Sequence, residues 1–277
     1  MTMTGKFVPV AVLAAAFMTV GVACGFAATA SPVDFNAPDI AKVVKSFEGK
    51  APEQWGQEAD GVVRRFEPCG KQIALTFDAC GGPHGSGYDR ELIEFLRSEN
   101  INATLFINAR WLEANPETFM ELASDPLFTI ANHGLRHMPC SMTGKKAYGI
   151  KGTTGVKEVI EEIEGGAAII EGASGKRPRF YRSGTNHYDE IAVKVANALD
   201  HSVIGCSVNG DGGATFSAEQ VKSQLLSAKP GDIVLMHMNH PEKQTAEGVM
   251  AAVPLLREKG FSFVGLEEAL PPDIEDM

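Results

Sequence analysis

The chain has 277 residues and is acidic, because 35 aspartates and glutamates stand against 25 lysines and arginines, a net charge of −10. A surface of this charge disfavours nucleic acid and anionic lipid, so neither is expected as a partner. The length is sufficient for one large domain with a substantial core, such as a single α/β barrel.

The first thirty residues have the pattern of a secretory signal peptide. Their one charge, Lys6, is followed by an apolar run from Phe7 to about Cys24 and then by the small residues Ala28 and Ala30. This order favours cleavage after Ala30. The alternative is a retained membrane anchor, which the shortness of the run disfavours. We therefore expect an exported protein, periplasmic or extracellular, that is not stably inserted in the membrane.

Residues 31–68 precede the first predicted strand. They contain four prolines and show no strong hydrophobic periodicity. We interpret them as an N-terminal extension that lies over the main domain, residues 69–277.

Short apolar runs alternate with amphipathic helical patterns from residue 70 onward. The runs are almost continuously apolar, which is typical of parallel strands covered on both faces. Strands are predicted at Ile73–Ala79, Ala103–Ala109, Phe128–His133, Arg179–Arg182, Ser202–Val208, Asp232–Met238 and Phe261–Leu266. Helices are predicted at Asp89–Glu99, Gly155–Glu171, Asp189–Leu199, Ser217–Ser227 and Thr245–Lys259. This alternation favours a closed or nearly closed α/β barrel of about seven parallel strands, with an open doubly wound sheet as the alternative.

Polar side chains gather at the carboxyl ends of the predicted strands, where parallel α/β folds place their ligand sites. These side chains are Asp78, His133, Arg182, Asn209 with Asp211, and His237. Any one of them could serve a turn or a structural hydrogen bond. Their occurrence at the same end of five strands indicates a functional site.

The segment NHGLRH places His133 and His137 four residues apart. On one helical turn, this spacing would put both imidazoles on the same face, able to bind one divalent ion. The spacing alone is a weak signal. Its position after a buried strand, level with Asp78, favours a metal site over two structural histidines.

Several motifs resemble those of the polysaccharide deacetylases of the NodB-homology type, carbohydrate esterase family 4, over about residues 70–270. TFDA resembles the family's TFDD, HGLRH its HxxxH, FYRSG its arginine motif and IVLMH its terminal leucine-histidine motif. The resemblance implies a distorted (β/α) barrel of about seven parallel strands. It also implies a hydrolase that removes N-acetyl groups from an acetylated amino-sugar polymer or oligomer, such as peptidoglycan or chitin.

The resemblance implies catalytic roles for three residues. Asp78 matches the general base that takes a proton from the attacking water, and His237 matches the general acid that protonates the departing sugar amine. Arg182 matches the arginine that pairs with the base and keeps it ionised and oriented.

It also implies a metal site and an oxyanion site. His133 and His137 match the two metal-binding histidines, so a divalent ion, expected to be zinc, would polarise the acetyl carbonyl. The backbone N–H that stabilises the oxyanion is, by position, that of Thr185.

The chain departs from the family pattern at the metal site. Ala79 stands where the family has a second aspartate that binds the metal, so TFDAC replaces TFDD. The missing ligand could be Asp78 itself, Asp211 or water, with His84 a less favoured substitute. We therefore expect an incomplete metal site with weaker or different selectivity.

Two other motifs also differ. Thr185 replaces a tyrosine, and the prolines after the arginine are Ser183 and Gly184. The family's DxxDW motif is NGDGG, with Asn209 in place of the first acid.

Two alternative functions follow from these departures. One is a metal-independent amidohydrolase acting on a small amide, and the other is a non-catalytic sugar-binding protein. Retention of Asp78, Arg182 and His237 disfavours the second, because binding alone needs no base, ion-pair partner and acid on three separate strands.

Four cysteines follow the predicted signal peptide: Cys69, Cys80, Cys140 and Cys206. In an exported protein one or two disulfides are expected. The favoured pair is Cys80 with Cys140, since each follows a predicted strand end. A catalytic thiol at Cys80 is the alternative.

Overall fold

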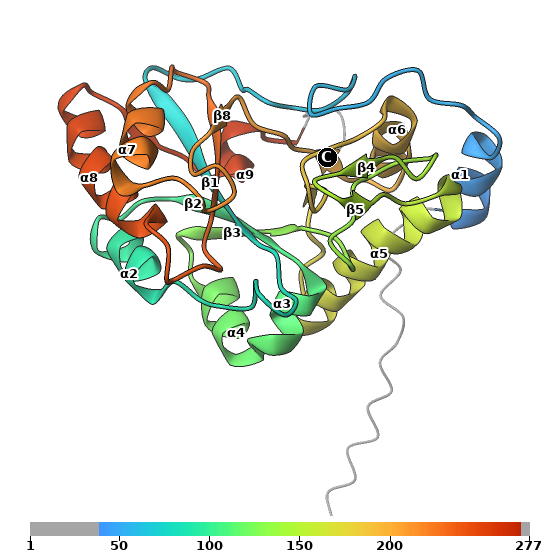
Figure 1. The fold of residues 1–277 in the computed structure, drawn as a ribbon, viewed down its shortest axis with the longest axis horizontal. Helices are drawn as coiled ribbons and strands as arrows, with labels where there is room; N and C mark the ends of the chain where they lie inside the picture. The colour runs from blue at the N-terminus through green and yellow to red at the C-terminus, as the bar shows by residue number, and fades with distance from the viewer. Residues whose placement is uncertain (1–38, 273–277) are drawn as a thin grey trace, which may run out of the picture. The chain divides into compact units, whose positions relative to one another are not determined.

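The computed structural model describes residues 39–272, so the predicted signal peptide, residues 1–30, lies outside the described residues. Eight strands in this part of the chain form one sheet (Figure 1). They are β1 (Gln72–Ala79), β2 (Ala103–Ile107), β3 (Phe128–Asn132), β6 (Phe180–Tyr181), β7 (Ser202–Val203), β8 (Val208–Asn209), β9 (Ile233–His237) and β10 (Ser262–Phe263).

The strand order is β7-β6-β3-β2-β1-β9-β8, with β10 paired to the first residues of β1, and every pair in this sheet is parallel. The two end strands, β7 and β8, are separated in sequence by residues 204–207 alone, so the sheet must curl to bring its ends near each other. Val63 of the N-terminal extension forms a β-bridge with Ile204 in this gap. The distorted (β/α) barrel predicted from the sequence is confirmed.

The helices of the described residues are α1 (Ile40–Phe47), which precedes the first strand, α2 (Arg90–Ser98), α3 (Ala109–Ala114), α4 (Pro116–Ser124), α5 (Gly155–Ser174), α6 (Glu190–Ala198), α7 (Ala218–Leu226), α8 (Thr245–Glu258) and α9 (Leu266–Ala269), which follows the last strand. The five predicted helices, which correspond to α2, α5, α6, α7 and α8, are confirmed with small differences at their ends. The short helices α3 and α4 were not predicted, because Asn115 and Pro116 interrupt their hydrophobic pattern.

Helix starts are fixed by side chains that the sequence supplies. The Asp89 carboxylate accepts a hydrogen bond from the backbone N–H of Leu92 at the start of α2. Ser217 and Gln220 form a reciprocal capping box at the start of α7. Both helices then bury an apolar face against the sheet, and α2 and α7 each pack against α8.

Strand β1 separates two apolar layers by its side-chain alternation. Ile73, Leu75, Phe77 and Ala79 are fully buried in the cluster that contains the apolar faces of α2 and α8. Ala74 belongs to a different cluster, together with Phe106 and other inward-facing residues of the barrel. Side chains at even positions of β1 therefore face the barrel interior, and those at odd positions face the helices.

The N-terminal extension contains one helix that the sequence pattern did not indicate. Val43 of α1 is buried in a cluster with residues of α5 and α6, so this helix covers the side of the barrel. Further along, Gly56 pairs with Tyr188 and Arg65 with Asp232. The described part of the extension therefore contacts the barrel at several points.

The predicted strand Ser202–Val208 is wrong as a single element, since β7 and β8 are separate. Between them the chain leaves the ladder, and the carbonyls of Ile204 and Gly205 instead accept hydrogen bonds from Arg182. A continuous strand would have required those carbonyls to face a neighbouring strand. Across residues 39–272, no helix combines the length and apolar character needed to cross a bilayer.

Candidate active site

The parallel register brings the predicted site residues to one end of the barrel. Asp78 on β1 is the direct cross-strand partner of His237 on β9. One residue further along, a single row of paired residues crosses four strands: Ala79, Ile107, Asn132 and Tyr181. The residues that follow this row emerge side by side; they are Cys80, Asn108, His133 and Arg182.

Asp78 and Arg182 form a buried ion pair. Asp78 is 3% exposed and Arg182 is fully buried, and the guanidinium Nη1 donates to Asp78 Oδ1 at 2.7 Å. Arg182 also donates to two backbone carbonyls and lies over the Phe106 ring at 4.0 Å. Burial opposes the charge on Asp78, but Arg182 together with His133 and His237 outweighs it and holds the pKa of the Asp78 carboxyl below its usual value.

His133 has a fixed tautomer. Its Nδ1 lies 2.9 Å from the carbonyl oxygen of Arg182, which can only accept, so Nδ1 carries the hydrogen. In the neutral ring, Nε2 is then left with a free lone pair. Asn108 holds the same segment by donating to the carbonyls of His133 and Gly134. This arrangement, with a carbonyl behind the ring, is the usual one for a metal-binding histidine.

The prediction that His133 and His137 lie on one helical turn is wrong. Residues 133–139 form a loop in which Gly134 and His137 have φ angles of +82° and +64°. The buried Glu162 carboxylate of α5 holds the loop by accepting backbone N–H bonds from Arg136 and Met138. The two imidazoles still meet, with ring centroids 4.9 Å apart, because the loop folds back over the strand end.

Gly184 permits the close approach of the His137 loop. A Cβ at Gly184 would lie 2.3 Å from the backbone carbonyl carbon of His137, so a side chain there must displace the loop. We expect Gly184→Ala to move His137 and to lower the hydrolytic activity that the sequence resemblance implies by about tenfold or more, with bound metal measured by elemental analysis. Gly172→Ala on α5, where a Cβ meets nothing within 4 Å, is the matched control and should keep full activity. A fully active Gly184→Ala protein would contradict this account.

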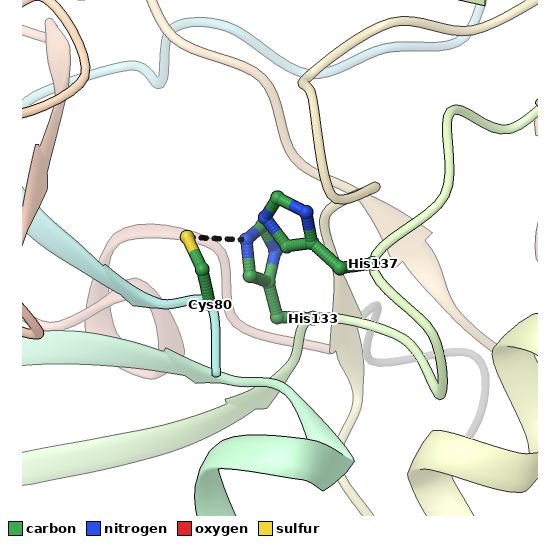
Figure 2. A group of neighbouring side chains, drawn as sticks. All are labelled: Cys80, His133 and His137. Atoms are coloured by element: carbon green, nitrogen blue, oxygen red, sulfur yellow. Dashed lines mark hydrogen bonds between the residues drawn. The ribbon is translucent and has the colours of Figure 1, made fainter. Parts of the chain in front are cut away.

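Cys80, His133 and His137 form a group of metal-ligating side chains (Figure 2). One ligand atom from each lies within 4.8 Å of the others, and Cys80 Sγ is 3.8 Å from His133 Nε2. His137 Nε2 is buried and has no hydrogen-bond partner among the described residues. An orphaned buried nitrogen beside a thiol and a second imidazole fits a divalent metal ion.

The predicted disulfide between Cys80 and Cys140 is wrong, because each of the four described cysteines is a free thiol. Cys140 is fully buried under α6, whereas Cys80 lies at the barrel mouth. Burial raises the pKa of the Cys80 thiol, but the adjacent His137 and His133 outweigh it and hold that pKa well below its usual range.

His237 is oriented by Asp211. The imidazole Nδ1 lies 3.0 Å from Asp211 Oδ1, and the backbone N–H of His237 donates to Asp211 Oδ2 at 2.7 Å. Burial disfavours the imidazolium, but the Asp211 carboxylate together with Cys80 outweighs it and holds the pKa of His237 well above its usual value. Asp211 is therefore committed to His237, and His84 is exposed on its loop, so neither supplies the missing metal ligand.

A cavity of about 460 Å³ opens over these side chains. Asp78, Cys80, His137 and His237 lie in its wall, together with Thr185. The buried Thr185 Oγ1 has no hydrogen-bond partner among the described residues. This volume is within the usual range for small-molecule sites.

Several wall residues were not predicted from the sequence, among them Gln57, Tyr148 and Phe216. Gln57 comes from the N-terminal extension and donates to the Tyr148 hydroxyl at 3.3 Å. Tyr148 lies between β4 (Lys146–Ala147) and β5 (Ile150–Lys151), with its ring edge-on to His187 at 5.2 Å. No local pattern marked these residues, because they meet only through long-range packing.

The parallel barrel and its site bring a carboxylate, an imidazole and a group of metal-ligating side chains together at one end of the sheet. The sequence profile of polysaccharide deacetylases matches residues 66–204, half of the chain. The chain belongs to this family.

Individual relatives agree with this assignment. The chain is 28% identical over 199 residues to a bifunctional xylanase/deacetylase of Pseudobutyrivibrio xylanivorans, covering 72% of this chain and 30% of that protein. It is 24% identical to a chitooligosaccharide deacetylase of Rhizobium leguminosarum bv. phaseoli, covering 71% of this chain and 78% of the relative. The chain spans between 30% and 54% of the length of the first two curated relatives it matches.

Among solved structures, a carbohydrate esterase family 4 pseudoenzyme from Bacillus anthracis superposes with a TM-score of 0.62 at 22% identity. The match covers 75% of this chain and 68% of that one. At this identity the likeness concerns the fold alone.

Proposed function

We propose that this protein removes N-acetyl groups from an acetylated amino-sugar polymer or oligomer, of the peptidoglycan or chitin type, by metal-assisted hydrolysis. The observation that carries the proposal is the pairing of Asp78 with His237 across β1 and β9, beside the Cys80–His133–His137 group. A base and an acid thus face one cavity from adjacent strands.

Asp78 serves as the general base. Arg182 holds Oδ1 at 2.7 Å, while Oδ2 lies 3.6 Å from His133 Nε2, beyond hydrogen-bond distance, and can accept a proton. The lowered pKa keeps the carboxylate ionised at neutral pH. Asp78 therefore takes a proton from the water that attacks the acetyl carbon.

His237 serves as the general acid. Its raised pKa keeps the imidazolium populated at neutral pH, and Asp211 fixes the ring by its Nδ1, so Nε2 is the atom that delivers the proton. The proton goes to the sugar nitrogen as the carbon–nitrogen bond breaks, which releases acetate and the free amine.

His133 and His137 would hold a divalent ion, proposed to be zinc, which when bound supplies a Lewis acid for the acetyl carbonyl. The backbone N–H of Thr185 is proposed as the oxyanion donor, since Thr185 lies in the cavity wall. The cavity orients the acetamido group between Asp78 and His237.

Export is part of the proposal, because glycans of this type lie outside the cytoplasm. Its basis is the signal-like pattern of residues 1–30, which lie outside the described residues. Amino-terminal sequencing of the protein isolated from its host should give a mature chain that begins at Ser31. An intact Met1 on the exported protein would contradict cleavage.

The proposal is tested by acetate release. Purified protein is incubated with acetylated chitooligosaccharides and with acetylated peptidoglycan, before and after chelation, and Zn²⁺ is then restored. We expect acetate release that chelation abolishes and zinc restores. Hydrolysis untouched by the chelator would support the metal-independent amidohydrolase, and glycan binding without turnover would support the sugar-binding alternative.

Asp211→Asn is expected to shift the alkaline limb of the pH–rate profile to lower pH. The Asp211 carboxylate raises the pKa of His237, and the acid is active only while protonated. Without that charge, His237 loses its proton at lower pH, so activity is lost earlier as pH rises. The measurement is kcat against pH on an acetylated oligosaccharide.

Thr245→Val is the matched control for this variant. It removes the hydroxyl that donates to Asp211 Oδ2 at 3.1 Å but leaves the carboxylate in place. Its alkaline limb should stay close to that of the wild type. An Asp211→Asn profile identical to the wild type would show that Asp211 does not tune the acid.

A further inference from the structure

We infer that Cys80 is the third protein ligand of the ion and makes the site selective for thiophilic metals such as zinc. The inference rests on the proposed function in that it concerns the same ion. It adds a thiolate ligand at a position where the family pattern offers no counterpart, one residue beyond Ala79.

The backbone explains why Cys80 and not Ala79 reaches the site. Ala79 is the last residue of β1 and is fully buried in the helix-facing cluster. Alternation along the strand then turns Cys80 to the same side as Asp78, and both lie in the cavity wall. An aspartate at position 79 would point among apolar side chains in this conformation.

The ligand atoms are spaced for one ion. A tetrahedral zinc ion would separate a sulfur from an imidazole nitrogen by about 3.5 Å. Cys80 Sγ lies 3.8 Å from His133 Nε2, and His137 Nε2 completes a group within 4.8 Å. Figure 2 shows the Cys80 sulfur directed at the His133 ring, with the His137 ring beside it. Small shifts of the three side chains would bring all three ligand atoms within bonding distance of one ion.

Asp78, the other candidate from the sequence, is already engaged. Its Oδ1 is held by the buried Arg182, and the three-residue metal group of the described chain does not include it. We therefore assign Asp78 the base role alone. As a thiolate, Cys80 would supply the negative charge that two neutral imidazoles lack.

A thiolate changes which metal the site prefers. Sulfur ligands favour zinc and cobalt over manganese and magnesium, which prefer oxygen. Two imidazoles and one thiolate should therefore discriminate strongly against Mn²⁺. Replacing the thiolate with a carboxylate should reduce that discrimination while keeping the charge.

The test is Co²⁺ binding to the metal-free protein, read by absorption. A thiolate ligand produces a near-ultraviolet sulfur-to-cobalt charge-transfer band that nitrogen and oxygen ligands do not. We expect the band in the wild type and in Cys206→Ser, the matched control that removes the other cavity cysteine. We expect no band in Cys80→Ser or Cys80→Asp.

Metal affinities give a second readout. Loss of a residue that only hydrogen-bonds to a metal ligand typically lowers metal affinity by about 10- to 100-fold. Loss of a direct ligand should cost more, so Cys80→Ser should weaken Zn²⁺ binding by roughly a hundredfold or more. Cys80→Asp should lower the ratio of the Zn²⁺ affinity to the Mn²⁺ affinity. Zn²⁺ should also protect Cys80 from alkylation by iodoacetamide, followed by peptide mass spectrometry, while the exposed Cys69 stays reactive.

Some outcomes would overturn the inference and others the proposed function. Tight Co²⁺ binding without the band, or unchanged Zn²⁺ affinity in Cys80→Ser, would overturn the thiolate ligand while chelator-sensitive deacetylation still stood. The band with no acetate release under any metal would support the ligand and refute the deacetylase proposal. Two results together would instead indicate a catalytic thiol. Alkylation of the metal-free protein would irreversibly abolish activity in the wild type but not in Cys80→Ser, and cobalt would produce no charge-transfer band.

Discussion

Asp78→Asn is expected to lower turnover by about a hundredfold to ten-thousandfold, the usual effect of removing a general base. Asparagine keeps the size and shape of the side chain but cannot accept the proton from water. With Cys80 assigned as the third ligand, we expect the variant to keep its metal. The measurements are kcat on an acetylated oligosaccharide and metal content by elemental analysis.

Thermal stability must also be measured for this variant, since Arg182 would remain charged and fully buried without its partner. Breaking one side of a buried ion pair typically costs about 3–5 kcal/mol, so thermal unfolding should occur at lower temperature. Turnover is compared well below that transition. Wild-type turnover would show that Asp78 only stabilises the barrel, and loss of metal together with activity would return a ligand role to Asp78.

Replacing both His133 and His137 with alanine is expected to remove the bound metal and at least 99% of hydrolysis. These two imidazoles would supply two of the three proposed ligand atoms, and Cys80 alone would not retain the ion. The measurements are zinc content after dialysis and acetate release with zinc added back.

The single variant His137→Ala separates binding from folding. His133 is 1% exposed and hydrogen-bonded to Arg182, so its loss also disturbs the strand end. His137 Nε2 has no partner among the described residues, so its removal should cost metal but little stability. His240→Ala, at a half-buried turn position, is the control and should keep both metal and activity. Full activity in a metal-free double variant would exclude the metal-assisted mechanism.

The strands and long helices were predictable because their signals are local. Continuous apolar runs such as Ile73–Ala79 indicated strands covered on both faces, and caps such as Asp89 and Ser217 marked helix starts. The elements that were missed or misplaced depend on packing. The helix α1 gains its order by burying Val43 against α5 and α6, and the run at 202–208 breaks where Arg182 needs two backbone carbonyls.

The metal site shows where reasoning from motifs is insufficient. The HxxxH spacing correctly grouped His133 with His137, although the loop held by Glu162 replaces the expected helical turn. The resemblance of TFDA to TFDD concerns Ala79, and the sequence alone suggests only a disulfide or a catalytic thiol for Cys80. Strand alternation from Asp78 was the available signal, since it places Cys80 on the side of Asp78 and Ala79 on the other.

The sequence by itself determined the barrel of parallel strands and indicated that Asp78, Arg182 and His237 lie at the same end of it, because hydrophobic period and residue order are properties of the chain. Only the tertiary structure decided which side chains share the cavity. In the folded protein, Asp211 contacts His237, Gln57 and Tyr148 complete the cavity wall, and Cys80 lies beside His133. The physical reason is that these contacts depend on register between strands and on loops fixed by distant partners, and no local pattern encodes either.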